Sequence, residues 1–218
     1  MVGDLVADGI TDNTAALQAA IDADPLGADI ELGDGAYRIS GTLRIQKNHV
    51  RIRGKGSGQA PNDVPGRTRI VTSSPIDMIQ WGGTDFLASR GGMSDVDLVG
   101  SSVAARGLHI TGAAHLTFER VYIKQVTVEG ITLDNKDADG PGTGWSTFRD
   151  IHIGLRANCP DANGIGIYGS GTKNSVYNND WFGLAIAHMN GHGVIIRMGD
   201  GQRFYAPWIF RGPQETGY

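Results

Sequence analysis

The stretch DGITDNTAALQAAID, residues 8–22, decides how the rest of the sequence is interpreted. It opens with an Asp-Gly turn and continues as a short amphipathic pattern, in which Leu17 and Ile21 lie four residues apart and share one helix face. A side-chain oxygen of Thr11 or Asp12 can accept the first free N–H groups of such a helix. The sequence DPLG at residues 24–27 is typical of a helix end. We therefore expect a helix at about residues 14–23.

Beyond this stretch, the composition favours a single domain with many turns. The chain has 218 residues, 40% of them hydrophobic, which is enough for a buried core. Its 33 glycines are roughly twice the usual share. The net charge of -4 excludes the basic surface of a typical nucleic-acid-binding protein, and no apolar run approaches the length of a membrane-spanning helix. The single cysteine, Cys159, excludes an intrachain disulfide.

From residue 93 onward, two short strand patterns alternate along the sequence. In one pattern, a large apolar residue is followed by further large apolar residues three to five positions later. Its copies begin at Met93, Phe118, Phe148, Tyr177 and Phe204. The other pattern starts with glycine, and its copies begin at Gly107, Gly130, Gly164 and Gly193. A period of about 25–30 residues with two strands per repeat predicts a stacked solenoid. We expect the strands of successive repeats to pair in parallel.

Residues 8–22 resemble the entry motif of the pectate-lyase-like superfamily, Asp-Gly-x-Thr-Asp-Asp-Thr-Ala-Ala-x-Gln-x-Ala-Ile, with Asn13 in place of the second Asp. Residues 28–56 are similar to the first coil of that family, with a strand, an Asp-Gly turn, YRI and VRIRGKG in order. The family includes polysaccharide lyases, polygalacturonase-type hydrolases and bacteriophage tailspikes. The resemblance implies an all-β fold, a right-handed single-stranded parallel β-helix, with an N-terminal capping helix that plugs the solenoid.

We expect one β-helix domain over residues 1–218. Its parts are a capping helix region at 1–27, first coils at 28–90 with an irregular loop at 54–69, regular coils at 91–210 and a tail at 211–218. Stacking of the coils predicts inward columns of side chains. One column contains Val96, Val121, Ile151 and Trp181, another contains Leu108, Ile131, Ile165 and Val194, and Phe118 is expected to stack on Phe148.

The glycine-led strands carry the first candidate site. Aligned by their core residues, they place Asp134, Tyr168 and Arg197 at one outward level on three successive coils. Arginine pairs bidentately with a sugar carboxylate, and a tyrosine or arginine with a lowered pKa can remove the C5 proton of a uronic acid in β-elimination. We interpret these three as the candidate catalytic residues, with His109, two positions before their level, as a substrate-binding residue. The alternative is an ordinary solvated sheet face.

The other strand pattern carries a second candidate pair. Its alignment puts Asp150 and Asp180 in one column, about 5 Å apart on neighbouring coils. Two carboxylates at that separation can serve retaining glycoside hydrolysis or hold a Ca²⁺ ion. Arg120 in the same column favours a plain charge ladder instead. Apart from such a Ca²⁺ ion, we expect no metal site and no cofactor.

Further side chains suit sugar binding. Tyr122 and His152 lie beside that column, and Trp145 offers a ring for stacking on a sugar. The sequences NND at 178–180 and GHG at 191–193 are similar to fragments of the polygalacturonase pattern, but its Asp-Asp pair and its Arg-x-Lys are absent. We therefore interpret this partial match as coincidental.

Three functions are compatible with the resemblance. The first is a bacteriophage tail or tailspike-type protein that binds a host surface polysaccharide, with or without depolymerising it. The second is a secreted polysaccharide lyase or glycoside hydrolase, and the third is a structural or carbohydrate-binding solenoid without catalysis. The start MVGD lacks the basic residues and apolar run of a signal peptide, which favours the first function unless a signal has been removed. The expected location is a virion tail or the extracellular space. Whether the chain is an enzyme stays open.

The expected partners are a polysaccharide and further copies of the chain, with no nucleic acid and no membrane. A β-helix ends in a coil of unpaired strand edges, and such an end needs a cap. The helix at residues 14–23 covers the first end, whereas the last expected strand, 203–210, is followed only by a short polar tail. We therefore expect a homotrimer or a larger virion assembly.

Overall fold

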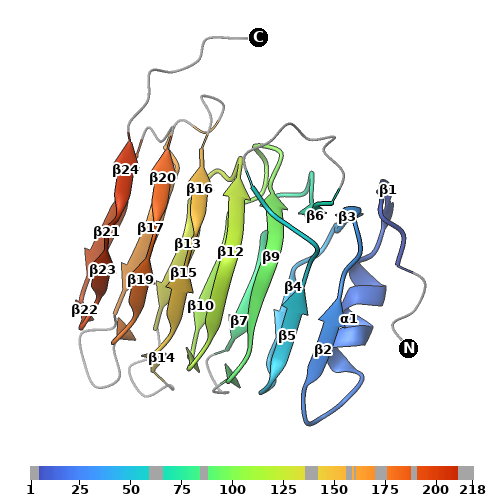
Figure 1. Ribbon diagram of the computed structural model, residues 1–218, viewed down its shortest axis with the longest axis horizontal. Helices are drawn as coiled ribbons and strands as arrows, with labels where there is room; N and C mark the ends of the chain where they lie inside the picture. The colour runs from blue at the N-terminus through green and yellow to red at the C-terminus, as the bar shows by residue number, and fades with distance from the viewer. Residues whose placement is uncertain are drawn as a thin grey trace.

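The structure, a computed structural model, describes residues 5–58, 66–83, 88–135, 142–155, 159, 161–169, 176–187 and 191–210. The centre of the expected irregular loop, at 59–65, and the expected tail at 211–218 lie outside the described residues. The described strands pair in parallel in three sheets. Successive coils of the chain stack along one axis, so the chain is a parallel β-helix (Figure 1). No described helix is long and apolar enough to cross a membrane.

Three sheets make up the faces of the helix. Sheet A contains β1 (Asp8–Asp12), β2 (Ala28–Glu31), β3 (Gly35–Arg38), β5 (Val50–Arg53), β6 (Thr68–Val71), β9 (Gly92–Val99), β12 (Thr117–Lys124), β15 (Thr147–Arg149), β16 (His152–Gly154), β19 (Asp180–Phe182), β20 (Ala185–Ala187), β23 (Arg203–Tyr205) and β24 (Trp208–Phe210). Sheet B contains β4 (Leu43–Ile45), β7 (Asp77–Gly82), β10 (Arg106–Thr111), β13 (Glu129–Asp134), β17 (Asn163–Tyr168) and β21 (Val194–Arg197). Sheet C contains β8 (Ala88–Ser89), β11 (Ala113–Ala114), β14 (Thr143–Gly144), β18 (Val176–Tyr177) and β22 (Gly199–Asp200).

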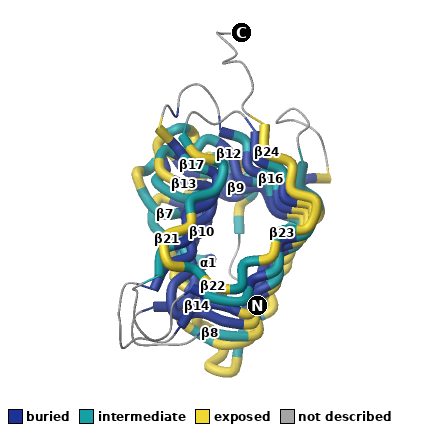
Figure 2. The backbone as a smooth tube through the Cα atoms, turned by 90° about the vertical axis from the view of Figure 1, so that its left-hand side faces the viewer, coloured by how far each residue is buried: buried dark blue, intermediate teal, exposed yellow. Residues whose placement is uncertain are grey.

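From β7 onward, each coil passes through sheet B, then sheet C, then sheet A. Viewed along the axis, β7, β10 and β21 of sheet B lie on the side opposite β23 of sheet A, and β8, β14 and β22 of sheet C lie between them (Figure 2). The sequence patterns predict sheets A and B but miss sheet C. Its strands are only two residues long, which is too short to show any alternation of polar and apolar residues.

The expected core columns are largely confirmed. Val96 pairs with Val121, and the glycine-led strands pair in register through Leu108, Ile131, Ile165 and Val194. The rings of Phe118 and Phe148 stack with centroids 5.2 Å apart.

The placement of Trp181 level with Ile151 is wrong. Trp181 pairs with Phe148, and the two rings stack with centroids 3.9 Å apart. Phe204 continues the same stack on the next coil, at 5.6 Å from Trp181. The sequence pattern places Trp181 in the aliphatic column of Ile151. Its ring belongs instead to the aromatic column of Phe148, which lies three residues before Ile151 in the chain.

The glycines that lead the sheet B strands have a packing role. A Cβ on Gly107 would lie 2.5 Å from Cγ2 of Ile123, and one on Gly130 would lie 2.6 Å from Cγ2 of Ile153. The strands of sheet B therefore approach the isoleucines of sheet A so closely that only glycine fits. This close approach is the physical reason for the glycine-led repeat in the sequence.

Helix α1 (Thr14–Asp22) covers the N-terminal end of the β-helix, as expected (Figure 1). Leu17 and Ile21 are buried against the first coil. Gln18 replaces a missing neighbour strand: its Nε2 donates to the carbonyl oxygen of Arg44 and its Oε1 accepts from the N–H of Arg44, both at 2.9 Å. The side chain thereby satisfies backbone groups of β4, the edge strand of sheet B.

The entry turn is fixed by carboxylates. Oδ1 of Asp8 accepts the N–H groups of Ile10 and Thr11, each at 2.7 Å. Oδ1 of Asp12 accepts the N–H of Thr14, the first residue of α1, at 3.0 Å, so of the two expected acceptors it is Asp12 that binds a free N–H of the helix, while the N-cap residue Asn13 makes no side-chain capping bond. These contacts explain why the Asp-Gly-x-Thr-Asp motif marks this end of the fold.

The other end of the described solenoid exposes apolar side chains. Within the described residues, β21, β22, β23 and β24 each pair on one side only. The exposed large hydrophobic side chains of this end coil are Ile196, Met198, Tyr205, Trp208, Ile209 and Phe210.

Candidate functional site

The outer face of sheet B brings the first candidate set into register. Asp134 pairs with Tyr168, and Tyr168 with Arg197, on three successive strands, as the alignment predicts. Their exposure differs, because Asp134 is only 2% exposed whereas Tyr168 is half-buried and Arg197 is exposed. Only Tyr168 and Arg197 are thus open to a ligand at this level.

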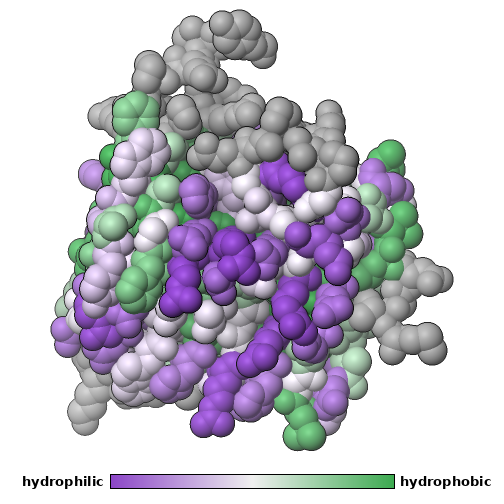
Figure 3. Space-filling view, viewed as in Figure 1, coloured by the Kyte–Doolittle hydropathy of each residue, from purple (hydrophilic) through white to green (hydrophobic). Residues whose placement is uncertain are grey.

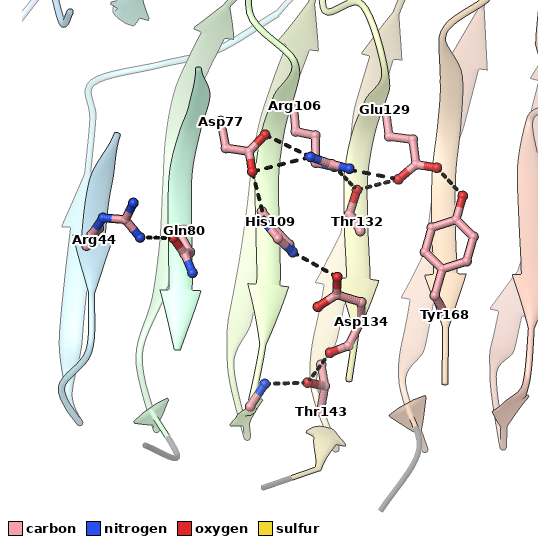
Figure 4. A network of polar contacts seen from close by, with 11 residues as sticks. Arg44, Asp77, Gln80, Arg106, His109, Glu129, Thr132, Asp134, Thr143 and Tyr168 are labelled. Carbon is pink, nitrogen blue, oxygen red and sulfur yellow. Dashed lines mark hydrogen bonds and ion pairs between the residues drawn. The ribbon is translucent and has the colours of Figure 1, made fainter. Parts of the chain in front are cut away.

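A histidine held between two carboxylates lies at the centre of this face (Figure 4). Nδ1 of His109 is 2.9 Å from Oδ2 of Asp77, and Nε2 is 3.0 Å from Oδ2 of Asp134. The three residues come from the adjacent parallel strands β10, β7 and β13. An imidazole can donate to both carboxylates only when both of its nitrogens carry a proton.

Arg106 connects this arrangement to the next acidic residue. Its Nη1 lies 3.1 Å from Oδ1 of Asp77, and its Nε donates to Oγ1 of Thr132 at 2.9 Å. The same Nε is 4.0 Å from Oε2 of Glu129. Charges therefore alternate across the strands as Asp77, Arg106 and Glu129, which occupy one register row.

Glu129 in turn holds the candidate catalytic tyrosine. The hydroxyl groups of Tyr168 and Thr132 both donate to the Glu129 carboxylate (Figure 4). The carboxylate can lie over the neighbouring strand because residue 166 is glycine, where a Cβ would be only 2.4 Å from Oε1 of Glu129. We call the set Asp77, Arg106, His109, Glu129, Thr132, Asp134 and Tyr168 the sheet B cluster.

The ionisation of the cluster follows from burial and from these pairs. Burial on its own would lower the pKa of His109, but the hydrogen bonds and charges of Asp134 and Asp77 raise that pKa to about 9. Burial would raise the pKa of Asp77, but the contacts with His109 and Arg106 hold it below its ordinary value. At neutral pH, His109 is therefore a cation between two carboxylates.

Tyr168 differs from the expectation on one point. Burial and the hydrogen bond to Glu129 raise the pKa of the Tyr168 phenol to about 12. The expectation of a lowered pKa, which would make Tyr168 a base by itself, is wrong for this structure. The phenol is a proton donor whose proton points at a carboxylate.

Sequence reasoning missed Asp77, Arg106 and Glu129. Each is the first residue of its sheet B strand, one position before Met78, Gly107 or Gly130. Reading that preceding position as a column would have shown the alternation of charges. Among the described residues, no cluster of three or more histidine, cysteine or acidic side chains is placed to hold a metal ion.

The expected Asp150–Asp180 pair does not form. Asp180 pairs with Thr147 and Arg203, three positions before the level of Asp150, and its carboxylate accepts from Nε of Arg203 at 2.6 Å. Asp150 instead lies at a bend of sheet A with φ of 51°, in the same row as Arg120 with φ of 50°. The error follows from the misplaced Trp181, which shifted this part of the alignment by three residues. Neither a catalytic pair nor a paired Ca²⁺ ligand set results.

The remaining candidate residues lie on other faces. Tyr122 and His152 pair in register on sheet A, with ring centroids 6.1 Å apart. Trp145 lies at the corner between sheets C and A and is 51% exposed. Of the four expected substrate-binding residues, only His109 therefore belongs to the sheet B cluster.

Comparisons with known proteins identify the fold. No protein-family model and no curated protein matches the sequence. The structure is similar to an alginate lyase from Paenibacillus sp. str. FPU-7, with a TM-score of 0.61 and 17% identity over 90% of this chain and 65% of that chain. It is also similar to ORF18 of Geobacillus virus E2, with a TM-score of 0.50 and 14% identity over 88% of this chain and 53% of that chain.

This chain therefore spans less than two thirds of the length of either protein. The similarity agrees with the entry motif, with the parallel pairing of every sheet and with the right-handed crossovers expected between parallel strands. The chain has the right-handed parallel β-helix fold of the pectate-lyase-like proteins.

Proposed function

We propose that this chain binds an acidic polysaccharide across the outer face of sheet B and cleaves it by β-elimination. The observation that carries the proposal is the row formed by Tyr168, which donates to Glu129, and the exposed Arg197 on the next strand. Arg197, Tyr168 and Glu129 thereby combine a carboxylate clamp, a proton donor and a proton acceptor on the adjacent strands β21, β17 and β13. One of the structural neighbours is described as an alginate lyase, and alginate is a polymer of uronic acids.

Arg197 is the proposed clamp. Among the described residues it makes no ion pair and no hydrogen bond through its side chain, so its guanidinium is available to a sugar carboxylate. A bidentate pair of this kind orients the sugar ring and withdraws charge from the carboxylate. Loss of charge on that carboxylate makes the neighbouring C5–H bond easier to break.

Tyr168 and Glu129 are the proposed proton-transfer pair. The phenol oxygen takes the C5 proton while its own proton passes to Glu129, the C4–C5 double bond forms and the C4–O4 bond breaks. The departing O4 then takes a proton back through the phenol, so that the pair ends as it began. The raised pKa of Tyr168 agrees with a phenol that stays protonated until the substrate binds. His109 is already protonated and held on both sides, so in this scheme it orients Asp134 and Asp77 and is not the base.

The experiment is a comparison of single variants on uronic acid polymers such as alginate or polygalacturonate. Elimination leaves a double bond that absorbs in the ultraviolet, so its rate is read directly. Tyr168→Phe keeps the ring and removes the transferable proton, and it should abolish turnover while oligosaccharide binding persists. Arg197→Ala should weaken binding by about tenfold or more. Arg38→Ala, which removes an arginine from sheet A, is the charge-matched control.

Unchanged turnover in Tyr168→Phe would refute the catalytic part of the proposal. If no uronic acid polymer is cleaved but Arg197→Ala still weakens binding selectively, the chain is a binding protein without catalysis. That outcome would favour the tailspike-type role, in which the chain recognises a host surface polysaccharide on a virus particle. The similarity to ORF18 of Geobacillus virus E2 is the observation that keeps this second function and a virion location in view.

A further inference from the structure

A groove lies on the opposite side of the solenoid from the sheet B cluster. It has a volume of about 410 Å³ and lies over β5 and the first halves of β9 and β12. Its polar lining includes Arg51, Arg53, Arg90, His115 and Glu119. In the axial view this strip of sheet A continues to β23, across the core from β10 and β21 (Figure 2). Hydrophilic side chains gather over β5, β9 and β12 on this face (Figure 3).

The groove has an excess of available positive charge. Arg53 pairs with Asp29, and Glu119 pairs with Arg120, so these charges are already matched. Arg51 and Arg90 are exposed, and neither forms an ion pair or a side-chain hydrogen bond with the described residues. Two guanidinium groups thus line one groove without a protein carboxylate of their own.

Two positions in the lining of the groove are restricted to glycine by backbone packing. A Cβ on Gly91 would lie 2.3 Å from the carbonyl oxygen of Val50, and one on Gly92 would lie 1.8 Å from that of Thr117. Residues with side chains do not fit at either position, so these two residues contribute only main chain to the lining of the groove. A groove of this volume flanked by guanidinium groups can accommodate a ring that carries an acidic substituent.

An exposed ladder of side chains continues the groove along the corner between sheets C and A. Arg90, His115 and Trp145 occupy the same position on three successive coils: Arg90 donates its backbone N–H to the carbonyl oxygen of Ala114, and His115 donates its own to that of Gly144, in each case the residue just before the counterpart on the next coil. Their φ angles are 58°, 55° and 48°. Bulky residues adopt this left-handed conformation at a cost, which glycine or asparagine would avoid. The rings of His115 and Trp145 are parallel, with centroids 5.2 Å apart.

We propose that this groove is a second carbohydrate site, which binds an acidic sugar unit between Arg51 and Arg90 and stacks the next unit on the ring of Trp145. Charge-assisted hydrogen bonds from two arginines select the carboxylate. The Trp145 ring stacks on His115 and meets the Tyr177 ring edge to face, with centroids 4.7 Å apart, so both neighbours hold it in place. The half of the side chain that stays exposed offers an apolar surface to the C–H groups of a sugar. The site is independent of catalysis on sheet B and would let one polysaccharide, or two neighbouring chains, engage both sides of the solenoid.

The test measures oligosaccharide binding by calorimetry and by tryptophan fluorescence. The probes are an oligomer of four to six uronic acid units, a neutral glucose oligomer of the same length and inorganic phosphate. All variants are made in an Arg197→Ala background, which separates this groove from the proposed sheet B site. In that background, the double variant Arg51→Ala/Arg90→Ala should bind the acidic oligomer at least about tenfold more weakly. Trp145→Phe should bind more weakly than its parent and lose most of the ligand-induced fluorescence change, because Trp81 and Trp181 are buried and the exposed Trp208 lies on β24 of the end coil, outside the lining of the groove.

Arg38→Ala in the same background is the control and should bind as its parent does. Equal affinity for the acidic and the neutral oligomer would overturn the role of the arginines. Affinity for phosphate equal to that for the oligomer, with no effect of Trp145→Phe, would show a simple anion site and overturn the carbohydrate assignment. Undiminished binding in the double arginine variant would place the acidic ligand elsewhere. A failure of the sheet B proposal would instead appear as unchanged binding when Arg197→Ala is compared with the unmodified chain.

Discussion

The charge of His109 depends on two neighbouring carboxylates. Its pKa is raised from an ordinary value near 6.5 to about 9, so the imidazolium stabilises the folded state fully below pH 6.5, and this contribution is lost as pH rises through about 9. The contribution is up to about 3 kcal/mol. Thermal denaturation should therefore show a fall in stability between pH 6.5 and 9.

The variant His109→Gln keeps hydrogen-bonding capacity but does not titrate. Its stability should be lower at pH 6 and nearly flat over the same pH interval. A pH profile of the unmodified chain that is as flat as that of the variant would show that His109 is not held as a cation.

Residue-level prediction from the sequence succeeded where side chains follow the strand alternation. The level of Asp134, Tyr168 and Arg197 could be derived because the glycine-led strands share one register. The partners that decide their ionisation could not be derived from the sequence, because Glu129 reaches Tyr168 across the space left by Gly166. Such a contact depends on which neighbour lacks a side chain, and no periodic pattern of one strand contains that information.

At the level of strands, the core columns predict how much a buried position contributes. Ile167 and Ile196 pair in register on β17 and β21, yet Ile167 is fully buried and Ile196 is 47% exposed. Ile167→Ala should lower the free energy of unfolding by about 2–5 kcal/mol, because it removes buried contacts and leaves a void. Ile196→Ala is the matched control and should cost clearly less. Equal losses from the two substitutions in chemical denaturation would contradict the assignment of the end coil.

The capping helix predicts a second effect at this scale. Gln18 makes two hydrogen bonds to the backbone of Arg44 on the edge strand β4. Gln18→Ala should cost about 1–2 kcal/mol and increase aggregation, since it leaves backbone groups of an edge strand without partners. Gln18→Glu keeps an acceptor but loses the donor, so its stability should lie between that of Gln18→Ala and that of the unmodified chain. An alanine variant as stable and as soluble as the unmodified chain would show that the amide does not protect the edge.

Among the elements, the sequence predicts α1 and the alternation of sheets A and B, because long-range repeats and an entry motif mark them. It does not predict the bend of sheet A at Asp150, the aromatic column that contains Trp181, or the two-residue strands of sheet C. These features depend on single residues in the left-handed conformation and on aromatic stacking between coils. A hydrophobic pattern with a period of two residues indicates neither of them.

For the whole molecule, the end coil predicts self-association. Its exposed apolar side chains include Trp208, Ile209 and Phe210, and β24 has a partner on one side only among the described residues. We propose that further copies of the chain cover this coil, as in a trimer or a larger assembly. Light scattering should give a mass of a defined oligomer that falls when Trp208 and Ile209 are both replaced by lysine. A monodisperse monomer at high concentration would refute this proposal.

The central claim is that sheet B presents its outer face to an acidic polysaccharide. Its most direct test is nuclear magnetic resonance of the ¹⁵N-labelled protein during titration with a short uronic acid oligomer. We predict saturable shifts of backbone amides along β10, β13, β17 and β21, with the largest near Tyr168 and Arg197, and no such shifts with a neutral glucose oligomer. The claim would be contradicted if the acidic oligomer binds but the amide resonances of these four strands do not shift.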